Sequence, residues 1–142
     1  MPYEKHLNSN IRTGRHCVFN MHVHLVFVTK YRRKVFEKHH IEPLRDIFEN
    51  ICKKFESTLE ECNGEDDHIH LLINYPPKVS ISKLVNNLKT VSSRMMRQQY
   101  PDIANRYFKN TLWTPSYFAS SCGGAPLGII KQYVQSQRII NQ

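Results

Sequence analysis

The chain lacks any long run of apolar residues. Across its 142 residues no stretch approaches the roughly 18 consecutive apolar residues that a membrane span requires. The polar start MPYEKHLNSN also lacks the apolar segment of a secretory signal, and neither an internal repeat nor a low-complexity tract is present. We therefore expect a cytoplasmic protein with no membrane association, and the length predicts a single domain over residues 1–142.

Cysteine pairs at metal-binding spacing are missing as well. The four cysteines, Cys17, Cys52, Cys62 and Cys122, are scattered and form no C-x-x-C pair. This spacing argues against a zinc knuckle and against a disulfide framework, so we expect reduced thiols.

Acidic residues are scarce relative to basic ones. The chain has 12 Asp and Glu against 20 Lys and Arg, a formal net charge of +8. Such a surplus favours a polyanionic partner, nucleic acid or an anionic membrane, although a charge that only aids solubility remains the alternative. The stretch KYRRK, Lys30 to Lys34, places four cations and an aromatic ring at the end of a predicted strand, which suits contacts to phosphates.

The periodicity of apolar residues predicts alternating strands and helices. Strands are predicted at 17–29, from Ser57, around 68–73 and at 116–122, with a tight turn at Asn63-Gly64. Helices are predicted from Pro43 to Phe55, from Ser80 to before Pro101, and over about 126–140, and Gly123-Gly124 reads as a hinge. The order β-α-β-β-α-β plus a C-terminal helix predicts an α+β, ferredoxin-like (RRM-like) fold with an antiparallel sheet.

Two histidines in DDHIHLLINYPP are the first candidates for chemistry. In a strand His68 and His70 share one face, while the apolar residues between them take the other. A second pair, His22 and His24, has the same spacing on the first strand, and spacing alone does not choose between the pairs. We favour the later pair because two carboxylates precede it, and we interpret His22 and His24 as structural or DNA-facing.

Tyr133 and Gln137 lie four residues apart in the last predicted helix. Their side chains therefore share one helix face, where a phenol and an amide oxygen can approach a common point. The alternative is that both residues merely border the apolar stripe of a packing helix.

Several motifs in unbroken order resemble one family. The segments RHCVFNMHVHLVFVTKYRRKVF, DHIHLLINYPP, LWTPSYFASSCGG and IIKQYVQSQ are similar to the small single-tyrosine transposases of the HUH endonuclease superfamily, which mobilise insertion sequences as single-stranded DNA. The resemblance extends from about Arg15 to Gln137. It implies that His68, His70 and Gln137 bind a divalent metal, Mg²⁺ or Mn²⁺, and that Tyr133 is the nucleophile.

The resemblance also implies a reaction and an assembly. Attack by Tyr133 on single-stranded DNA with hairpin ends would give a 5′-phosphotyrosine and a free 3′-OH. A homodimer is implied, in which the tyrosine helix of one subunit can pack against the histidine pair of the other. The basic residues that we expect to bind DNA are Lys30, Arg32, Arg33, Lys34, Lys89, Arg94 and Arg97.

Three alternatives to an insertion-sequence transposase stay open from sequence. A domesticated relative would use Tyr133 to cleave chromosomal palindromic repeats. A non-catalytic module on an RRM-like sheet would bind single strands by stacking bases on aromatic residues. A phosphohydrolase would activate water with a metal at His68 and His70 and would form no covalent adduct.

Overall fold

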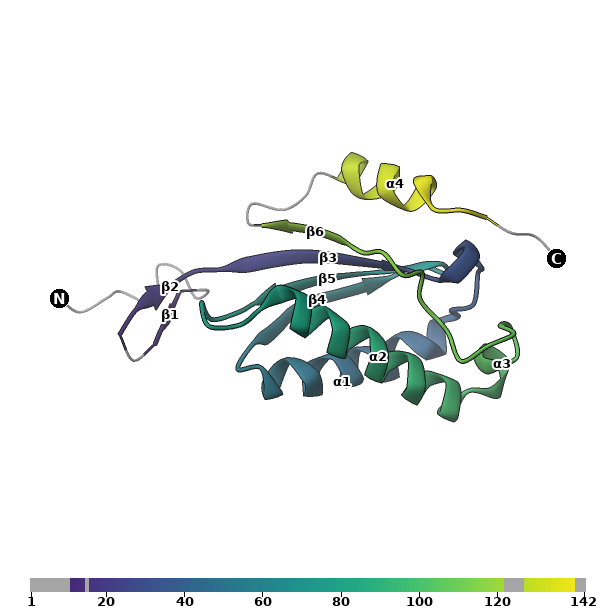
Figure 1. Ribbon diagram of the computed structural model, residues 1–142, viewed down its shortest axis with the longest axis horizontal. Helices are drawn as coiled ribbons and strands as arrows, with labels where there is room; N and C mark the ends of the chain where they lie inside the picture. The colour runs from purple at the N-terminus through teal and green to yellow at the C-terminus, as the bar shows by residue number, and fades with distance from the viewer. Residues whose placement is uncertain (1–10, 15, 122–126, 140–142) are drawn as a thin grey trace.

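The computed structural model describes residues 11–14, 16–121 and 127–139. Its main sheet has four antiparallel strands in the order β4-β5-β3-β6, with α1 and α2 on one face and α4 on the other (Figure 1). The elements are β3 (His22–Val28), α1 (Lys38–Lys54), β4 (Thr58–Gly64), β5 (His68–Asn74), α2 (Ile81–Gln99), α3 (Pro101–Ala104), β6 (Phe118–Ser121) and α4 (Leu127–Ser136). Because β5 lies between β3 and β4, the predicted ferredoxin-like order is confirmed.

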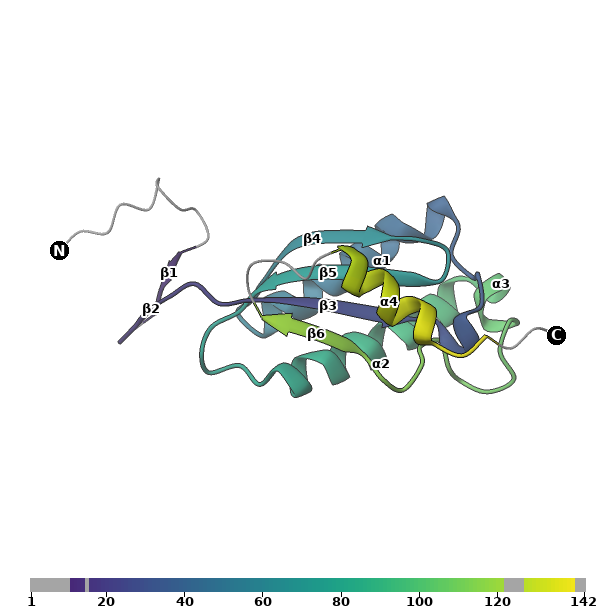
Figure 2. The same cartoon turned by 90° about the horizontal axis from the view of Figure 1, so that it is seen from above.

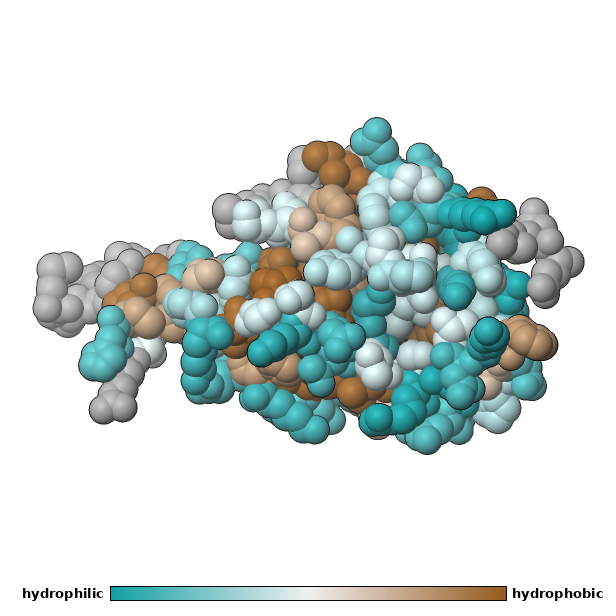
Figure 3. Space-filling model, in the orientation of Figure 1, coloured by the Kyte–Doolittle hydropathy of each residue, from teal (hydrophilic) through white to brown (hydrophobic). Residues whose placement is uncertain are grey.

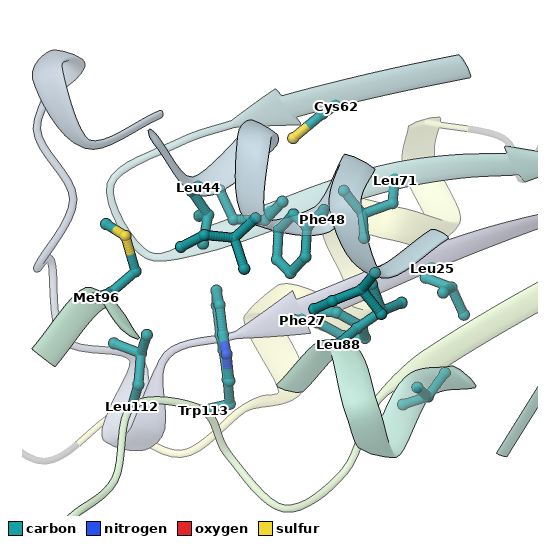
Figure 4. Packing of buried hydrophobic residues seen from close by; sticks show 14 of the residues in the cluster. Leu25, Phe27, Leu44, Phe48, Cys62, Leu71, Leu88, Met96, Leu112 and Trp113 are labelled. Atoms are coloured by element: carbon teal, nitrogen blue, oxygen red, sulfur yellow. The ribbon is translucent and has the colours of Figure 1, made fainter. Parts of the chain in front are cut away.

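The core lies between the sheet and helices α1 and α2. Alternate residues of β5, Ile69, Leu71 and Ile73, are fully buried on this face. Figure 4 shows the rings of Phe27, Phe48 and Trp113 in this core together with Leu71. Phe27 meets the other two rings edge-on at centroid distances of 6.0 and 5.7 Å. Because this core occupies one face of the sheet, α4 packs on the opposite face.

Helix α2 agrees with its prediction, whereas α1 begins earlier than predicted. Ser80 caps α2 by accepting a hydrogen bond from the backbone N–H of Lys83, and α2 ends before Pro101. Helix α1 begins at Lys38, so Pro43 lies in its second turn and not in the first. The earlier start is stabilised by His40, whose Nδ1 accepts a hydrogen bond from the backbone N–H of Glu37.

The predicted strand over 17–29 is divided in two. Only β3 joins the main sheet, while β2 (Val18–Phe19) pairs with β1 (Arg12–Thr13) in a separate two-stranded ribbon. Arg12 attaches this ribbon to the sheet by donating hydrogen bonds to Asn74 and to the carbonyl of Glu56. The apolar composition of residues 17–19 therefore did not indicate burial in the main sheet, and Cys17 and Val18 are exposed.

The predicted turn at Asn63-Gly64 is wrong in position. Both residues belong to β4, where they pair with His70 and Ile69, and the chain turns after them. A Cβ on Gly64 would lie 2.6 Å from the side chains of Ile41 and Ile69. The glycine therefore permits close packing of α1 against the strand, a role that a turn motif does not reveal.

Helix α4 is shorter than the predicted span of about 126–140. It ends at Ser136, and Gln137 follows with its backbone N–H donating to the carbonyl of Val134. Gly123-Gly124, the predicted hinge, and Cys122 lie outside the described residues. Within the described ranges, no helix combines the length and apolar character that crossing a bilayer demands.

Candidate active site

His68 and His70 lie on the face of the sheet that α4 covers. In the register of the central strands, His68 is opposite Val28 and His70 is opposite Val26. Ile69 between them points to the core on the other face, so the prediction that the two imidazoles share one face is confirmed. Figure 2 shows α4 crossing obliquely over the middle of this face.

Asp67 fixes the orientation of His68. The Nδ1 atom of His68 lies 2.8 Å from Oδ1 of the buried Asp67, and Arg32 donates from Nε to the other carboxylate oxygen at 3.1 Å. Because a carboxylate accepts hydrogen bonds, Nδ1 of His68 is the donor to Asp67, and Nε2 is the ring nitrogen on the side away from this carboxylate. A carboxylate behind an imidazole is the usual support of a metal-binding histidine.

His70 is paired with His24 of the neighbouring strand. The Nε2 atom of His70 lies 2.9 Å from Nδ1 of His24, and the two rings stack with an angle of 9° between their planes. Burial lowers the pKa of His70, and His24 lowers it further, while Glu61 acts in the opposite direction. His70 is therefore neutral at pH 7, a state that leaves one ring nitrogen able to bind a metal.

The two histidines of β3 have separate environments. His24 belongs to the site through its contact with His70, whereas His22 binds Glu60 and Asn74 through Nε2. Both residues were predicted to be structural or DNA-facing. The register of β3 against β5 is what distinguishes them, and the spacing of the motif does not contain that information.

Helix α4 is held on this face by a small apolar cluster. Ile130 and Val134 pack against Val26 and Val28, which are the cross-strand neighbours of the two histidines. Tyr133 borders this cluster, and its ring packs against Phe118 of β6 at a centroid distance of 5.6 Å. The structure thus brings Tyr133 to the same face of the sheet as His68 and His70.

The hydroxyl of Tyr133 is directed to Ser116 and not to the histidines. It lies 2.9 Å from Ser116 Oγ, and Ser116 in turn donates a hydrogen bond to Oε1 of Gln137 at 3.4 Å. Within the described residues, no hydrogen bond joins Tyr133 to His68 or His70. Strands β5 and β6 are two strand spacings apart, about 9.5 Å, because β3 lies between them.

Burial raises the pKa of Tyr133, and the hydrogen bond to Ser116 offsets part of that rise. The phenol is therefore protonated at neutral pH. Either hydroxyl can be the donor in the bond between Tyr133 and Ser116. The sequence contained no signal for Ser116, because the contact joins two segments 17 residues apart through the fold.

Lys89 fixes the segment that carries Ser116. Its ammonium donates to the carbonyls of Thr114, Pro115 and Ser116 at 2.7, 3.0 and 3.0 Å. Burial lowers the pKa of Lys89 to about 8. Lys89 was predicted to bind DNA, and the structure directs its ammonium to these carbonyls.

The other predicted DNA-binding residues fall into two groups. Arg32 is paired with Asp67, Arg33 donates to the carbonyl of Arg106, and Arg97 donates to Ser93. The second group is Lys30, Lys34 and Arg94, whose charged groups form no hydrogen bond or ion pair among the described contacts. Lys30 lies over the ring of Tyr31, and Lys34 and Arg94 are exposed. The structure therefore spreads these cations over two regions, the segment 30–34 and helix α2.

A cluster of metal-ligating side chains that the sequence analysis missed lies at the start of α1. Glu37, His39, His40 and Asp102 place their ligand atoms within 4.8 Å of one another. Both ring nitrogens of His40 are engaged, since Nδ1 accepts from the Glu37 backbone and Nε2 lies 3.1 Å from Asp102. Burial lowers the pKa of His40, and the neighbouring His39 lowers it further. This cluster is carried by α1 and α3, on the other side of the sheet from His68 and His70.

Comparisons with known proteins identify the family to which the chain is similar. The family model described as "Transposase IS200 like" matches residues 17–137. The chain is 29% identical over 127 residues to the ISDra2 transposase TnpA of Deinococcus radiodurans, covering 89% of this chain and 91% of the relative. It is 30% identical over 122 residues to the IS200 transposase of Salmonella typhimurium, covering 86% and 80% of the two chains.

Solved structures show the same fold. A crystal structure from Deinococcus radiodurans R1, assigned as a transposase, aligns with a TM-score of 0.83 and 29% identity over 91% of this chain and 99% of that one. A REP-associated tyrosine transposase bound to a REP hairpin aligns with a TM-score of 0.55 over 87% of this chain and 67% of the other. At 11% identity the second likeness concerns the fold alone.

Proposed function

Because the chain belongs to the IS200-like transposase family, we propose that it cuts and rejoins single-stranded DNA at the hairpin-marked ends of an insertion sequence, with Tyr133 as the nucleophile. The observation that carries this proposal is the common location of four side chains. Tyr133 and Gln137 approach the face of the sheet on which His68 and His70 lie. A phenol and three potential metal ligands on one face are what a metal-assisted phosphoryl transfer requires.

The donor set of this face fits a divalent cation. His68 presents Nε2 because Asp67 holds its other nitrogen, and His70 is neutral. Gln137 supplies an amide oxygen. Two imidazoles and an amide leave coordination positions open, and a bound Mg²⁺ or Mn²⁺ would withdraw charge from the scissile phosphate. His70 Nε2 and Gln137 Oε1 are engaged with His24 and Ser116, so binding through these atoms requires both contacts to open.

Tyr133 performs the covalent step. Its oxygen forms a bond to the phosphorus while the bond from phosphorus to the 3′ oxygen breaks, and the leaving oxygen gains a proton to become a 3′-OH. The phenol loses its own proton to water or to a nearby base. Because the phosphotyrosine conserves the energy of the ester bond, a second 3′-OH can reverse the reaction and join strands without ATP.

The position of Tyr133 supports a rearrangement before attack. Its hydroxyl is hydrogen-bonded to Ser116, which precedes β6, and β6 lies two strand spacings from the histidine strand β5. Either α4 shifts across the face, or it serves the histidine pair of a second subunit in a homodimer. The small cluster that holds α4, Ile130 and Val134 on two valines, is compatible with both arrangements.

The proposal is tested with single-stranded oligonucleotides that carry the hairpin ends flanking the protein's own gene. They are incubated with protein and Mg²⁺ or Mn²⁺ and resolved on a denaturing gel. We expect a metal-dependent covalent band that Tyr133→Phe and His68→Ala abolish. Tyr117→Phe is the matched control, because Tyr117 is a more exposed tyrosine next to Ser116. Binding without a covalent band would favour a non-catalytic module, and multiple turnover without one would favour a hydrolase.

A further inference from the structure

The side chain of Phe108 is almost completely in water. Its exposed fraction is 98%, against 37–54% for the other exposed large apolar side chains in the described ranges. Phe108 lies in the turn that follows α3, between Arg106 and Lys109. Figure 3 shows a hydrophobic protrusion beside hydrophilic side chains at the end of the molecule where α3 lies. A fully exposed ring at a defined position is typical of a contact surface.

The turn is tied to the basic segment Lys30–Lys34. Arg33 donates from its guanidinium to the carbonyl of Arg106, and Arg106 donates to the carbonyl of Lys34 at 3.3 Å. The Arg33 guanidinium also lies 5.0 Å from the ring of Tyr31 and 5.0 Å from the ring of Tyr107. These contacts hold Arg106 and Tyr107, the two residues before Phe108, in place. The Phe108 ring therefore projects from a turn whose position is fixed.

The backbone of the basic segment is held in an unusual conformation. Tyr31 and Arg32 have φ angles of 61° and 55°, in the left-handed region that residues with side chains rarely adopt. Thr29 stabilises this turn by donating from Oγ1 to the carbonyl of Arg33 at 2.6 Å. Such strained positions are concentrated at functional sites, where the surrounding structure maintains them.

The two segments form one basic and aromatic surface. We call the segments 30–34 and 105–109 together the basic corner. Their sequences, KYRRK and NRYFK, contain no acidic residue. The cations of the basic corner are Lys30, Arg32, Arg33, Lys34, Arg106 and Lys109. Asp67 neutralises Arg32, whereas Lys34 and Lys109 are exposed and suited to contact phosphates.

The basic corner is continuous with the candidate active site. A cavity of about 170 Å³ is lined by Lys30 and Tyr31 of the basic corner and also by Gln137 and Arg138. A strand whose scissile phosphate lies near Gln137 therefore passes Lys30 and Tyr31 of the basic corner.

We propose that the basic corner binds the unpaired DNA strand beside the cleavage site, with Phe108 stacking on one base and Lys34 and Lys109 contacting the phosphates around it. The inference rests on the proposed function and adds the surface that positions the strand. An exposed ring suits single-stranded DNA because only an unstacked base offers its face to an aromatic side chain. Positive charge around the ring matches the phosphates on both sides of that base.

Binding is measured by fluorescence anisotropy with labelled oligothymidine, without metal and in Tyr133→Phe protein, so that no cleavage contributes. We expect Phe108→Ala to weaken binding by roughly 5- to 150-fold, the range for loss of one stacked base, with Phe108→Leu close to Ala and Phe108→Trp close to the parent. The matched control is Val18→Ala, because Val18 is an exposed apolar residue of β2, far along the chain from the basic corner.

Three results would overturn the inference. Phe108→Ala could bind oligothymidine as tightly as the parent, or it could lose affinity for duplex and single strand by the same factor, which would exclude stacking. It could also change the oligomeric state in sedimentation, which would make Phe108 part of a contact between copies of the chain. The covalent-band assay tests Tyr133 separately, so its failure leaves the binding result interpretable.

Discussion

The hydroxyl oxygens of Tyr133 and Ser116 lie 2.9 Å apart, and Ser116 in turn reaches the amide oxygen of Gln137. One serine therefore engages both the proposed nucleophile and one proposed metal ligand. The arrangement holds the phenol beside Ser116 and Phe118, where burial raises its pKa and keeps it protonated. In the proposed mechanism, attack by Tyr133 on DNA requires this contact to open.

Ser116→Ala should speed formation of the covalent band. Removing a hydrogen bond worth about 0.5–1.5 kcal/mol releases the phenol and should raise the initial rate roughly 2- to 10-fold. Ser120→Ala is the matched control, because Ser120 belongs to β6 and contacts neither Tyr133 nor Gln137 among the described hydrogen bonds. A slower rate in Ser116→Ala would mean that the serine assists attack and does not restrain it.

Asp67→Asn should weaken metal binding. The carboxylate holds Nδ1 of His68, and loss of such a support typically lowers metal affinity roughly 10- to 100-fold. The readout is the Mn²⁺ concentration at which half of the covalent band forms. Asp66→Asn is the control, since Asp66 is exposed and precedes the same strand. An unchanged midpoint in folded Asp67→Asn protein would argue against metal binding at His68.

Lys89→Met should destabilise the protein by about 1–3 kcal/mol, since three carbonyls lose a half-buried cationic donor that solvent only partly screens. Lys83→Met, at an exposed position of the same helix, should have little effect.

The cost of Lys89→Met should also depend on pH. Burial lowers the pKa of Lys89 from 10.5 to about 8 in the folded protein. Above pH 8 the folded state loses a proton that the unfolded state keeps, so the unfolded state binds more protons up to about pH 10.5. The stability of the wild type should therefore rise with pH in this window relative to Lys89→Met. Urea unfolding on both sides of pH 8 measures this difference, and parallel curves for the two proteins would contradict it.

Ile130→Ala should loosen α4 without unfolding the rest. Ile130 is one of four buried side chains in the cluster that holds this helix, and the truncation removes about 2–5 kcal/mol of packing. In hydrogen exchange, the amides of α4 should lose protection while those of α2 keep theirs. Ile129→Ala is the control, because its side chain is largely exposed. Equal loss of protection in both helices would show that α4 and the core unfold together.

Local patterns predicted most of the sheet. The alternation around His68 and His70 gave the shared face, and the apolar period after Ser80 gave α2 together with its cap. These features depend on neighbours along the chain. The ribbon β1–β2 and the role of Gly64 could not be predicted, because each depends on which surface lies opposite in space.

The contacts within the candidate site were the least predictable. His24 meets His70 through strand register, Ser116 meets Tyr133 through the packing of α4, and Lys89 reaches carbonyls 25–27 residues away. No spacing rule relates these pairs. The sequence motif identified Tyr133 and Gln137 as neighbours of one helix face, but their connection through Ser116 is a property of the fold.

The central claim is that Tyr133 becomes covalently attached to DNA, and peptide mapping of the protein–DNA adduct tests it most directly. After nuclease treatment, trypsin should release Gln132–Arg138, a peptide in which Tyr133 is the one tyrosine. The account predicts that mass spectrometry finds this peptide with a 5′-nucleotide on Tyr133. An adduct on another residue, such as Tyr117, or an unmodified peptide from a protein that still cleaves DNA, would contradict the account.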